Sequence, residues 1–445
     1  MALWQAPDAL GPAWTYQAGG VLLGQAGGRL LGRKDDRHMV LIAGSRSGKS
    51  QTVLIPNLLR YPGPAVVIDP KGELYAETAA ARKAAGHKVV LLNPFNVGGF
   101  GTQGHNPLRE LAQSATLPAD AAQLADALII PPEKGDAHWT DSAKNLITGL
   151  ILHAMTVDAA SASIPLLRRQ LSDVERLGPL LEEMAENDAL GGAVQNIGRS
   201  MLGKTELDRD GSRSFSREMQ SIISTATEQT RPLDEIRPAL DRHDFELAEL
   251  AGERPVTVYL ALPATRIATH HRWLRLFIYQ VLAAMERRGI PRARLPLWLV
   301  LEEFAALGNL RSVEAAAGYM AGFGVKLWAI LQDLTQLRHH YPHTWETFLG
   351  NAGVIQAFGN VDATTTQYLS KMLGETIVEE EKHNFASAGA REHGDSGVRH
   401  DLRSVPLLAP AEITLYFARE ANRQLVLVPG ERPVYMDRLP FAGTG

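Results

Sequence analysis

The feature that most constrains this 445-residue chain is the segment Ala43-Gly44-Ser45-Arg46-Ser47-Gly48-Lys49-Ser50. It fits the phosphate-loop pattern, a Gly followed by four residues and then Gly-Lys-Ser or Gly-Lys-Thr, except that Ala43 replaces the first Gly. The apolar run from His38 to Ile42 predicts a buried strand before the loop, and Gln51 to Leu59 predicts a helix after it. A Gly-Lys-Ser occurring by chance in a turn would explain neither flanking element.

The loop predicts a binding site for ATP and magnesium. Successive backbone N–H groups in such a turn curl around phosphate oxygens, and the following helix N-terminus adds positive potential. Lys49 is expected to reach the β- and γ-phosphates, and the Ser50 hydroxyl is expected to ligate magnesium. The expected nucleotide contacts are Gly44, Ser45, Arg46, Ser47, Gly48, Lys49, Ser50 and Gln51.

A second signal lies at Leu297 to Glu303, where an apolar strand ends in two carboxylates. Glu302 is expected to hold magnesium, and Glu303 is expected to orient and deprotonate the water that attacks the γ-phosphate. Most such sites have Asp at the first position, so the longer Glu302 side chain changes the geometry around the metal. The alternative interpretation is an exposed acidic strand end.

Two further strand ends carry polar residues within reach of a nucleotide. Gln332 ends the run from Lys326 to Leu331 and is expected to sense the γ-phosphate, although a Gln that caps the next helix fits the spacing almost as well. Asp69 and Lys71 follow the run from Ala65 to Ile68, at the carboxyl edge where open α/β sheets bind ligands. A turn that starts a helix explains them equally well.

The order of apolar runs and helix-forming segments predicts an α/β fold. Strands and helices alternate from residue 38 to 92, which is typical of a doubly wound, mainly parallel sheet. The alternation returns at residue 256, after a long stretch of helical patterns that is clearest at 139–156 and 214–230. We therefore predict a nucleotide-binding domain in two parts, 1–114 and 241–445, with an all-α domain of residues 115–240 inserted between them.

Composition excludes several classes of protein. Hydrophobic residues make up 45% and charged residues 21%, as in globular chains, and the net charge of -4 indicates no global basic field for nucleic acid, although a local basic surface remains compatible with it. The sequence has no Cys, which excludes disulfides and Cys-ligated zinc and suits a reducing cytosol. No stretch reaches the roughly 18 consecutive apolar residues that a membrane helix needs, so we expect the chain as given to be soluble.

Together these motifs resemble those of the type IV secretion system coupling proteins, the TraG/TraD-like ATPases of conjugation and effector secretion. The resemblance covers nearly the whole chain and is far more specific than the phosphate loop alone. The matching stretches are the phosphate loop with Ile55 to Leu59, Asp69 to Leu74, Asn93 to Phe95, Asn106 to Leu108, Thr257 to Leu260, Glu302 to Gly308, Gln332 to Leu337 and Thr366 to Gly374.

The resemblance implies a RecA-like nucleotide-binding domain with an inserted all-α domain that recognises substrates. It implies homo-hexameric rings with ATP sites at subunit contacts, and delivery of DNA–relaxase complexes or protein effectors to a type IV secretion channel. The expected location is the cytoplasmic face of the bacterial inner membrane. Direct contact with DNA stays open.

Three features depart from the family pattern. Family members usually begin with transmembrane helices, which this sequence lacks; a removed or a naturally absent anchor would weaken ring assembly. Glu302 stands in place of Asp. No Arg precedes Gly322-Phe323-Gly324, where some relatives carry a candidate arginine finger. The substitutes are Arg266, Arg275 and Arg311, each of which a surface or salt-bridge position explains better.

Other conspicuous residues have simple explanations. His339, His340 and His343 fit no rigid metal-ligand spacing and are expected in a solvated loop. Trp139 and Trp273 lie in helical patterns and are expected in the core, and residues 386–400 are expected to form a mobile loop. Four arginines are compatible with DNA phosphates, but a solvent-facing helix end explains them better: Arg287, Arg288, Arg292 and Arg294.

Three functions are compatible with these features. The first is a coupling ATPase that recruits substrates for secretion. The second is a soluble DNA translocase or helicase-like ATPase not tied to secretion, because its nucleotide core would look the same. The third is an adaptor whose helical domain grips substrates while hydrolysis is weak or absent. Glu303 argues against an inactive site, and the missing Arg favours low activity in an isolated monomer.

Overall fold

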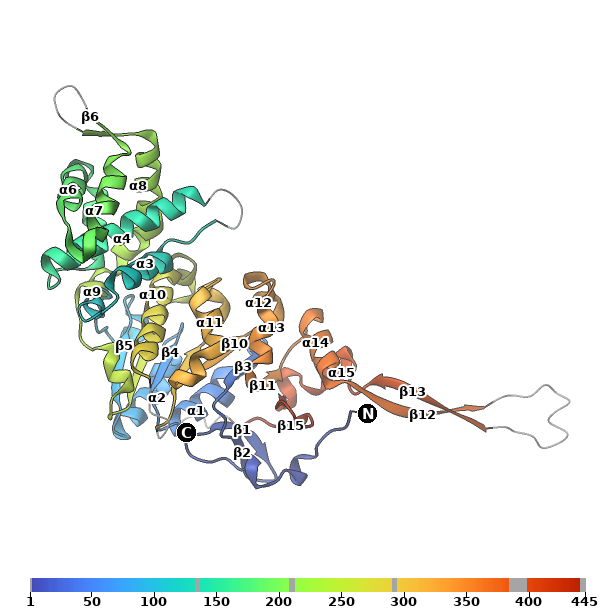
Figure 1. Ribbon diagram of the computed structural model, residues 1–445. Coiled ribbons are helices and arrows are strands. Elements are labelled where there is room, and N and C mark those ends of the chain that lie inside the picture. The colour runs from blue at the N-terminus through green and yellow to red at the C-terminus, as the bar shows by residue number, and fades with distance from the viewer. Residues whose placement is uncertain (1, 133–136, 208–212, 290–293, 384–397, 441–445) are drawn as a thin grey trace, which may run out of the picture. The chain divides into compact units, whose positions relative to one another are not determined.

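The computed structural model describes residues 2–132, 137–207, 213–289, 294–383 and 398–440 (Figure 1). The chain divides into two compact units. The first consists of Met1–Tyr61 and Trp328–Gly445, and the second of Pro62–Leu327. The parallel strands of each unit are followed by helices, as the alternating pattern of the sequence predicts.

The first unit is built on a mixed sheet. Its strands lie in the order β2-β1-β15-β14-β11-β3-β10, with β3 parallel to both β10 and β11 and the strands beyond β11 antiparallel. The boundary between the units falls within β10. The strand bounds are β1 Val21–Ala26, β2 Arg29–Arg33, β3 His38–Ala43, β10 Val325–Leu331, β11 Ala352–Phe358, β14 Arg423–Leu427 and β15 Val434–Asp437.

The three parallel strands of this unit are buried along their whole length. Their runs of Val, Ile, Leu and Ala have the continuous apolar character of strands covered on both faces rather than on one. The helices of the unit are α1 Ile55–Arg60, α12 Leu334–His340, α13 Trp345–Gly350, α14 Ala363–Leu373 and α15 Pro410–Tyr416. A π-helix, η3 (Ser50–Leu54), leads into α1.

A long hairpin that the sequence analysis did not predict flanks the expected loop, and its second strand includes the last three residues of that loop. β12 (Glu375–His383) and β13 (Val398–Pro406) pair antiparallel through nine residues each, as a separate two-stranded sheet that projects from the neighbourhood of α14 and α15 (Figure 1). Residues 386–397 of the predicted mobile loop lie outside the described residues, whereas residues 398–400 belong to β13. The many charges of these strands hide the apolar alternation by which a strand is recognised.

The sheet of the second unit is entirely parallel. Its strands lie in the order β9-β4-β8-β5, with bounds β4 Ala65–Ile68, β5 Lys88–Leu92, β8 Val256–Leu260 and β9 Leu297–Leu301. Three helices connect or follow these strands: α2 Glu73–Ala84, α10 Ala264–Arg288 and α11 Arg311–Tyr319. Parallel strands with crossover helices place all strand carboxyl ends at one edge, which is where α/β sheets bind ligands.

Between β5 and β8 the chain is helical. The helices are α3 Leu117–Leu128, α4 His138–Asp158, α5 Ile164–Ser172, α6 Val174–Glu186, α7 Ala189–Leu202, α8 Arg217–Thr230 and α9 Arg237–Asp241. A short hairpin, β6 (Thr205–Leu207) with β7 (Arg213–Phe215), interrupts them. None of the helices in the described ranges combines the length and apolar character that crossing a lipid bilayer requires.

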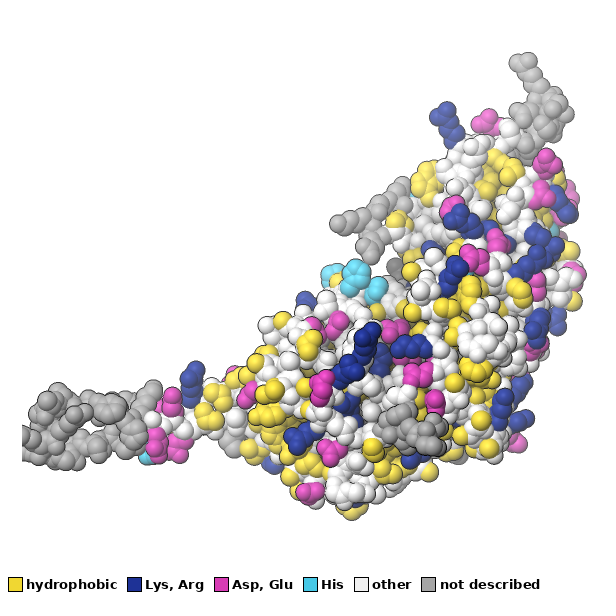
Figure 2. Space-filling view, turned by 180° about the vertical axis from the view of Figure 1, so that it is seen from behind, with side chains coloured by type: hydrophobic (Ala, Val, Ile, Leu, Met, Phe, Trp, Pro, Cys, Tyr) yellow, Lys and Arg dark blue, Asp and Glu magenta, His cyan; other side chains and the backbone are white. Residues whose placement is uncertain are grey.

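The prediction that two Trp residues lie in the core holds for only one of them. Trp273 is 3% exposed within α10, but Trp139 is 38% exposed at the start of α4, where its ring packs edge-on against His138. The first turn of a helix has no preceding turn to cover it, so a helical pattern alone does not place this residue. On the face shown in Figure 2, Lys and Arg side chains are interspersed with Asp and Glu, as the small net charge suggests.

Candidate functional site

The phosphate loop follows β3, the buried strand that lies between β10 and β11. Register places Ala43 beside Phe358 of β11, and Ile42 beside Leu331 of β10. The loop therefore begins at the carboxyl edge of three parallel strands, with Gln332 on one side and Gly359 on the other. The predicted strand–loop–helix order of this segment is confirmed.

Backbone geometry explains why the glycines of this loop stand where they do. Ala43 still belongs to β3, where a methyl group fits, whereas a Cβ on Gly44 would lie 2.0 Å from the carbonyl oxygen of Gly359. Gly48 adopts a left-handed conformation, with φ of 86°, that side chains disfavour. The required Gly is thus at position 44, which accounts for Ala43 at the position where the common pattern has its first Gly.

The side chains of the loop differ in their exposure. Ser45 and Arg46 are exposed, Lys49 is half-buried, and Ser47 and Ser50 are buried. The Ser47 hydroxyl has no hydrogen-bond partner among the described residues. A buried hydroxyl beside glycine backbone fits a loop that closes on an anionic ligand, because buried polar atoms otherwise find partners.

Arg438, which follows β15, contacts the backbone of the phosphate loop. Its guanidinium donates to the backbone carbonyl of Ser47 and, at 2.6 Å, to that of Arg419. It also stacks over the ring of Phe358, 4.5 Å from the ring centroid, and the side chain is 3% exposed. Sequence reasoning missed this residue, because an isolated Arg 391 positions away from Ser47 carries no local signal.

Gln332 lies at the same sheet edge as the loop. Its backbone carbonyl accepts a hydrogen bond from the side-chain amide of Asn360 at 3.3 Å, which joins the residue after β10 to the segment after β11. Its backbone N–H points to the side-chain carbonyl of Gln336 at 3.4 Å. Asp333, not Gln332, caps α12, since its carboxylate accepts from the Gln336 N–H at 2.9 Å. The capping explanation of Gln332 is therefore unnecessary.

The acidic motif ends β9 in the second unit. Glu302 is 5% exposed, and Glu303 takes a left-handed conformation with φ of 58°. That conformation is strained for a residue with a side chain, and such strain is concentrated at functional positions. The turn is fixed by a 2.7 Å hydrogen bond from the Ala306 N–H to the Glu303 carbonyl. Glu302 is buried, so the simple alternative of an exposed acidic strand end does not describe it.

Asp69 lies next to this motif. Ile68 of β4 is paired with Leu301 of β9, so Asp69 and Glu302 leave neighbouring strands at the same edge. One Asp69 oxygen accepts from the Tyr75 N–H at 2.8 Å, near the start of α2, and the other has no partner among the described residues. Burial raises the pKa of Asp69 above its usual range. Lys71 is exposed on the turn.

The arginines considered as finger residues have other partners or lie outside the described side chains. Arg275 is 4% exposed and donates to the carbonyls of Leu307 and Asn309 at 3.0 and 2.6 Å, so it is not a surface residue. Arg266 forms an ion pair of 3.2 Å with Glu235. The side chain of Arg311 is outside the described part of the chain.

The remaining residues singled out in the sequence lie on the surface. His339 and His340 end α12 with their rings packed edge-on, and His343 is exposed beyond it. Arg287 and Arg288 are exposed at the end of α10, where Arg287 is 3.4 Å from Asp120. Arg294 donates to the Gly252 carbonyl at 2.8 Å, and Arg292 lies outside the described residues.

Two groups of predicted site residues thus assemble, each within its own unit. In the first unit, residues 44–51 and Gln332 share one sheet edge with Arg438 behind the loop. In the second unit, Glu302 and Glu303 share an edge with Asp69. The first group offers backbone N–H groups, an ammonium group and a hydroxyl to a phosphate and its metal, and the second offers carboxylates.

Curated relatives of the chain include conjugal transfer proteins TraG and proteins VirD4. A conjugal transfer protein TraG of Escherichia coli is 29% identical over 402 residues, which are 84% of this chain and 61% of that protein. Protein VirD4 of Agrobacterium fabrum is 26% identical over 432 residues, which are 93% of this chain and 60% of that protein. The chain therefore spans about three fifths of the length of these relatives.

Solved structures of the conjugative coupling protein TrwB share the fold. A sulphate complex superposes with a TM-score of 0.72 at 18% identity and covers 99% of this chain and 94% of that one. A TrwB complex with an ATP analogue superposes with a TM-score of 0.67 at 17% identity, covering 96% and 91%. The predicted RecA-like P-loop α/β fold is thereby confirmed.

The family model described as type IV secretory system conjugative DNA transfer matches residues 7–441, which is almost the entire chain. The match includes the phosphate loop, the acidic strand end and the helices between them. This chain therefore belongs to the conjugative DNA-transfer family of type IV secretory systems.

Proposed function

We propose that this chain is the ATP-driven part of a coupling protein that recruits substrates and delivers them to a type IV secretion channel. The proposal rests on a phosphate loop that follows a buried parallel strand. The chain that carries this loop matches the conjugative DNA-transfer family from residue 7 to residue 441. The relatives are named for conjugal transfer and type IV secretion coupling. The expected cargo is a DNA–relaxase complex or a protein effector.

The nucleotide is ATP, held by residues 44–51. TrwB, which shares the fold, has been solved with an ATP analogue and with ADP and Mg²⁺. The Gly44 to Ser50 backbone would surround the β- and γ-phosphates, Lys49 would pair with them, and the Ser50 hydroxyl would ligate magnesium. When bound, magnesium neutralises charge on the phosphate oxygens; Glu302 is the carboxylate assigned to it.

Hydrolysis proceeds by attack of water on the γ-phosphorus, with cleavage of the bond to the bridging oxygen of ADP. Glu303 orients that water and accepts its proton, while Lys49 stabilises negative charge on the transferring group. Gln332 senses whether a γ-phosphate is present, because it leaves β10 at the edge from which the loop leaves β3. Arg438 keeps the Ser47 carbonyl turned away from the nucleotide side and is a positioning residue.

The helical segment, residues 115–240, is proposed to recognise the substrate. Its helices expose side chains without a motif of their own, so selection of cargo would depend on surface shape and charge. On the basis of the family resemblance we also propose assembly into a homo-hexamer at the cytoplasmic face of the inner membrane. An arginine finger, if a neighbouring subunit supplies one, is not Arg275, because that side chain is buried against backbone carbonyls.

The experiment that tests the proposal is ATP hydrolysis by the purified chain alone and with single- or double-stranded DNA. A rate that rises with DNA supports a DNA-coupled motor. A rate that DNA leaves unchanged, together with specific binding of a protein cargo to residues 115–240, supports protein delivery. ATP binding without turnover under every condition would overturn the motor and leave a substrate receptor.

A further inference from the structure

A buried cluster in the second unit contains none of the residues predicted to bind the nucleotide or its metal. His105 and Glu110 come from the segment by which the chain passes from β5 to the helices, and His243 comes from the segment by which it returns after α9. The two segments already lie against each other, since the His105 N–H bonds the Ala239 carbonyl at 2.8 Å and the Asp244 N–H bonds the Gly104 carbonyl at 3.0 Å.

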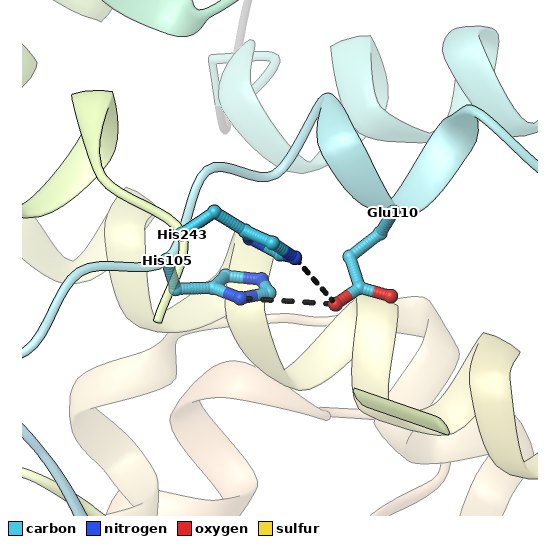
Figure 3. A group of neighbouring side chains, drawn as sticks. All are labelled: His105, Glu110 and His243. Atoms are coloured by element: carbon cyan, nitrogen blue, oxygen red, sulfur yellow. Dashed lines mark ion pairs between the residues drawn. The ribbon is translucent and has the colours of Figure 1, made fainter. Parts of the chain in front are cut away.

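The three side chains converge on one point. His105 Nδ1 is 3.9 Å from Glu110 Oε1, and His243 Nε2 is 3.8 Å from the same oxygen (Figure 3). One ligand atom from each residue lies within 4.8 Å of the others. These separations exceed a hydrogen bond. The His105 side chain is 2% exposed and the His243 side chain is 12% exposed. Both nitrogens are buried, and neither has a hydrogen-bond partner among the described residues.

The tautomer of His105 leaves a lone pair facing the gap. The Gln280 side-chain amide donates to the Pro107 carbonyl at 2.7 Å, so its oxygen faces His105 Nε2 at 3.2 Å and accepts the ring N–H. His105 Nδ1 therefore carries no proton and points a lone pair at a carboxylate oxygen. The lone pair of His105 Nδ1 and the Glu110 Oε1 atom, which are 3.9 Å apart, repel each other unless a proton or a cation lies between them. A hydrogen bond from the outer ring nitrogen is also the usual support of a metal-ligating His.

We propose that His105, Glu110 and His243 bind a divalent transition-metal ion of the zinc class. Two imidazoles and one carboxylate are a ligand set that zinc favours and that magnesium and calcium do not. An ion with bonds of about 2 Å holds its ligand atoms roughly 3.3 Å apart. Each imidazole therefore has to approach Glu110 by about half an ångström, and the two imidazole nitrogens, which lie within 4.8 Å of each other, have to approach by up to about 1.5 Å. The bound ion clamps the two segments that connect the helices to the sheet of the second unit.

The second imidazole has to exchange one contact for the metal. His243 Nδ1 accepts a long hydrogen bond of 3.3 Å from the Asn106 backbone N–H, which places the ring proton on Nε2. Binding through Nε2 transfers that proton to Nδ1 and breaks the Asn106 bond. Glu110 Oε1 keeps its bond from the Leu247 N–H at 2.8 Å, which holds the carboxylate in place.

A pocket of about 460 Å³ adjoins the cluster on the Glu110 side. Glu110 and Glu246 line it together with Arg109, Arg287 and Arg288. Glu246 Oε2 is 3.3 Å from His243 Nε2, so a fourth ligand position can be filled by this carboxylate or by water from the pocket.

The test is titration of the chelator-treated full-length chain with Zn²⁺, with the bound metal counted by elemental analysis and the melting temperature followed. We expect one equivalent to bind and to raise the melting temperature. Glu110→Gln retains the oxygen that accepts the Leu247 N–H and is expected to fold, but it should weaken zinc binding by roughly 100-fold. The matched control, H339N combined with H340N, removes the exposed pair on α12 and should leave the affinity unchanged.

Two results would overturn the assignment. One is folded wild-type protein that binds no zinc; the other is binding that survives Glu110→Gln but disappears in the double control, which would locate the ion at the exposed histidines. If Glu110→Gln does not fold, X-ray absorption of the zinc-loaded wild-type chain decides, because the proposal requires two imidazole ligands and oxygen in the first shell. ATP hydrolysis is not needed for any of these readouts.

Discussion

The phosphate loop and the acidic strand end are built on different principles. In the loop, the groups proposed to bind phosphate are backbone amides, and their positions depend on glycines packed against backbone, as at Gly44 and the Gly359 carbonyl. At the acidic end, the groups are the side chains of Glu302 and Glu303, and the backbone of Glu303 is itself strained. The loop thus depends on its backbone for the groups it offers, whereas the acidic end depends on two side chains, one of them on a strained backbone.

Lys49→Ala is expected to give the largest effect on the loop side of this comparison. It removes the only ammonium group in the segment from Gly44 to Ser50, so both binding of ATP and stabilisation of the transferring phosphate are lost. We expect the hydrolysis rate to fall by about 10² to 10³ or more. Steady-state kinetics with ATP measures this, beside Lys83→Ala on the exposed face of α2 as the matched control. Unchanged hydrolysis in Lys49→Ala would contradict the loop assignment.

Arg438→Met sharpens the comparison, because Arg438 hydrogen-bonds to the backbone of the phosphate loop. The change removes hydrogen bonds to the Ser47 and Arg419 carbonyls while keeping an apolar contact with Phe358. Hydrogen bonds to a charged group contribute about 1.5–3 kcal/mol, so we expect nucleotide affinity to fall by roughly 10- to 100-fold. Equilibrium titration with a fluorescent ATP analogue measures it.

The exposed Arg432 supplies the control for this measurement, as Arg432→Met should bind like the wild type. A purely structural role of Arg438 would lower the melting temperature without changing the affinity of the folded fraction. That outcome would show that Arg438 does not position the loop for nucleotide binding.

Gly44→Ala tests whether close packing, rather than flexibility, explains the glycine. The added methyl group would lie 2.0 Å from the Gly359 carbonyl oxygen, so β3 and the segment after β11 must move apart. We expect a loss of about 1–3 kcal/mol in the free energy of unfolding, measured by urea denaturation. Gly11→Ala, where a Cβ would meet no atom within 4 Å, is the matched control and should be nearly neutral.

Local sequence signals predicted the parts of the site whose chemistry lies in consecutive residues. The loop, the strand that ends at Glu302 and the run of helices between β5 and β8 all follow from short-range patterns. Contacts made across the fold were not predictable: Arg438 meets Ser47 from 391 positions away, and the 105–110–243 cluster joins two segments that carry no metal-binding spacing. The β12–β13 hairpin was missed because its charges obscure the strand pattern.

The position of Trp139 shows a further limit of predicting burial from helical periodicity. Its spacing within the pattern of α4 agrees with a buried stripe, yet the residue lies in the first turn and is 38% exposed. The division into domains at residues 114 and 240 stays a prediction of the same kind, and so does the role of residues 115–240 in substrate recognition. Deletion of that segment with retention of ATP binding would support it.

The most direct test of the central claim is to measure ATP binding and ATP turnover on the same preparations of wild type and Glu303→Gln. Glu175→Gln, on the exposed part of α6, serves as the control. Because Glu303 is assigned to the water rather than to the nucleotide, we expect the affinity to stay within about threefold while turnover falls by about 10² to 10⁴. Turnover at the wild-type rate in Glu303→Gln would contradict the account.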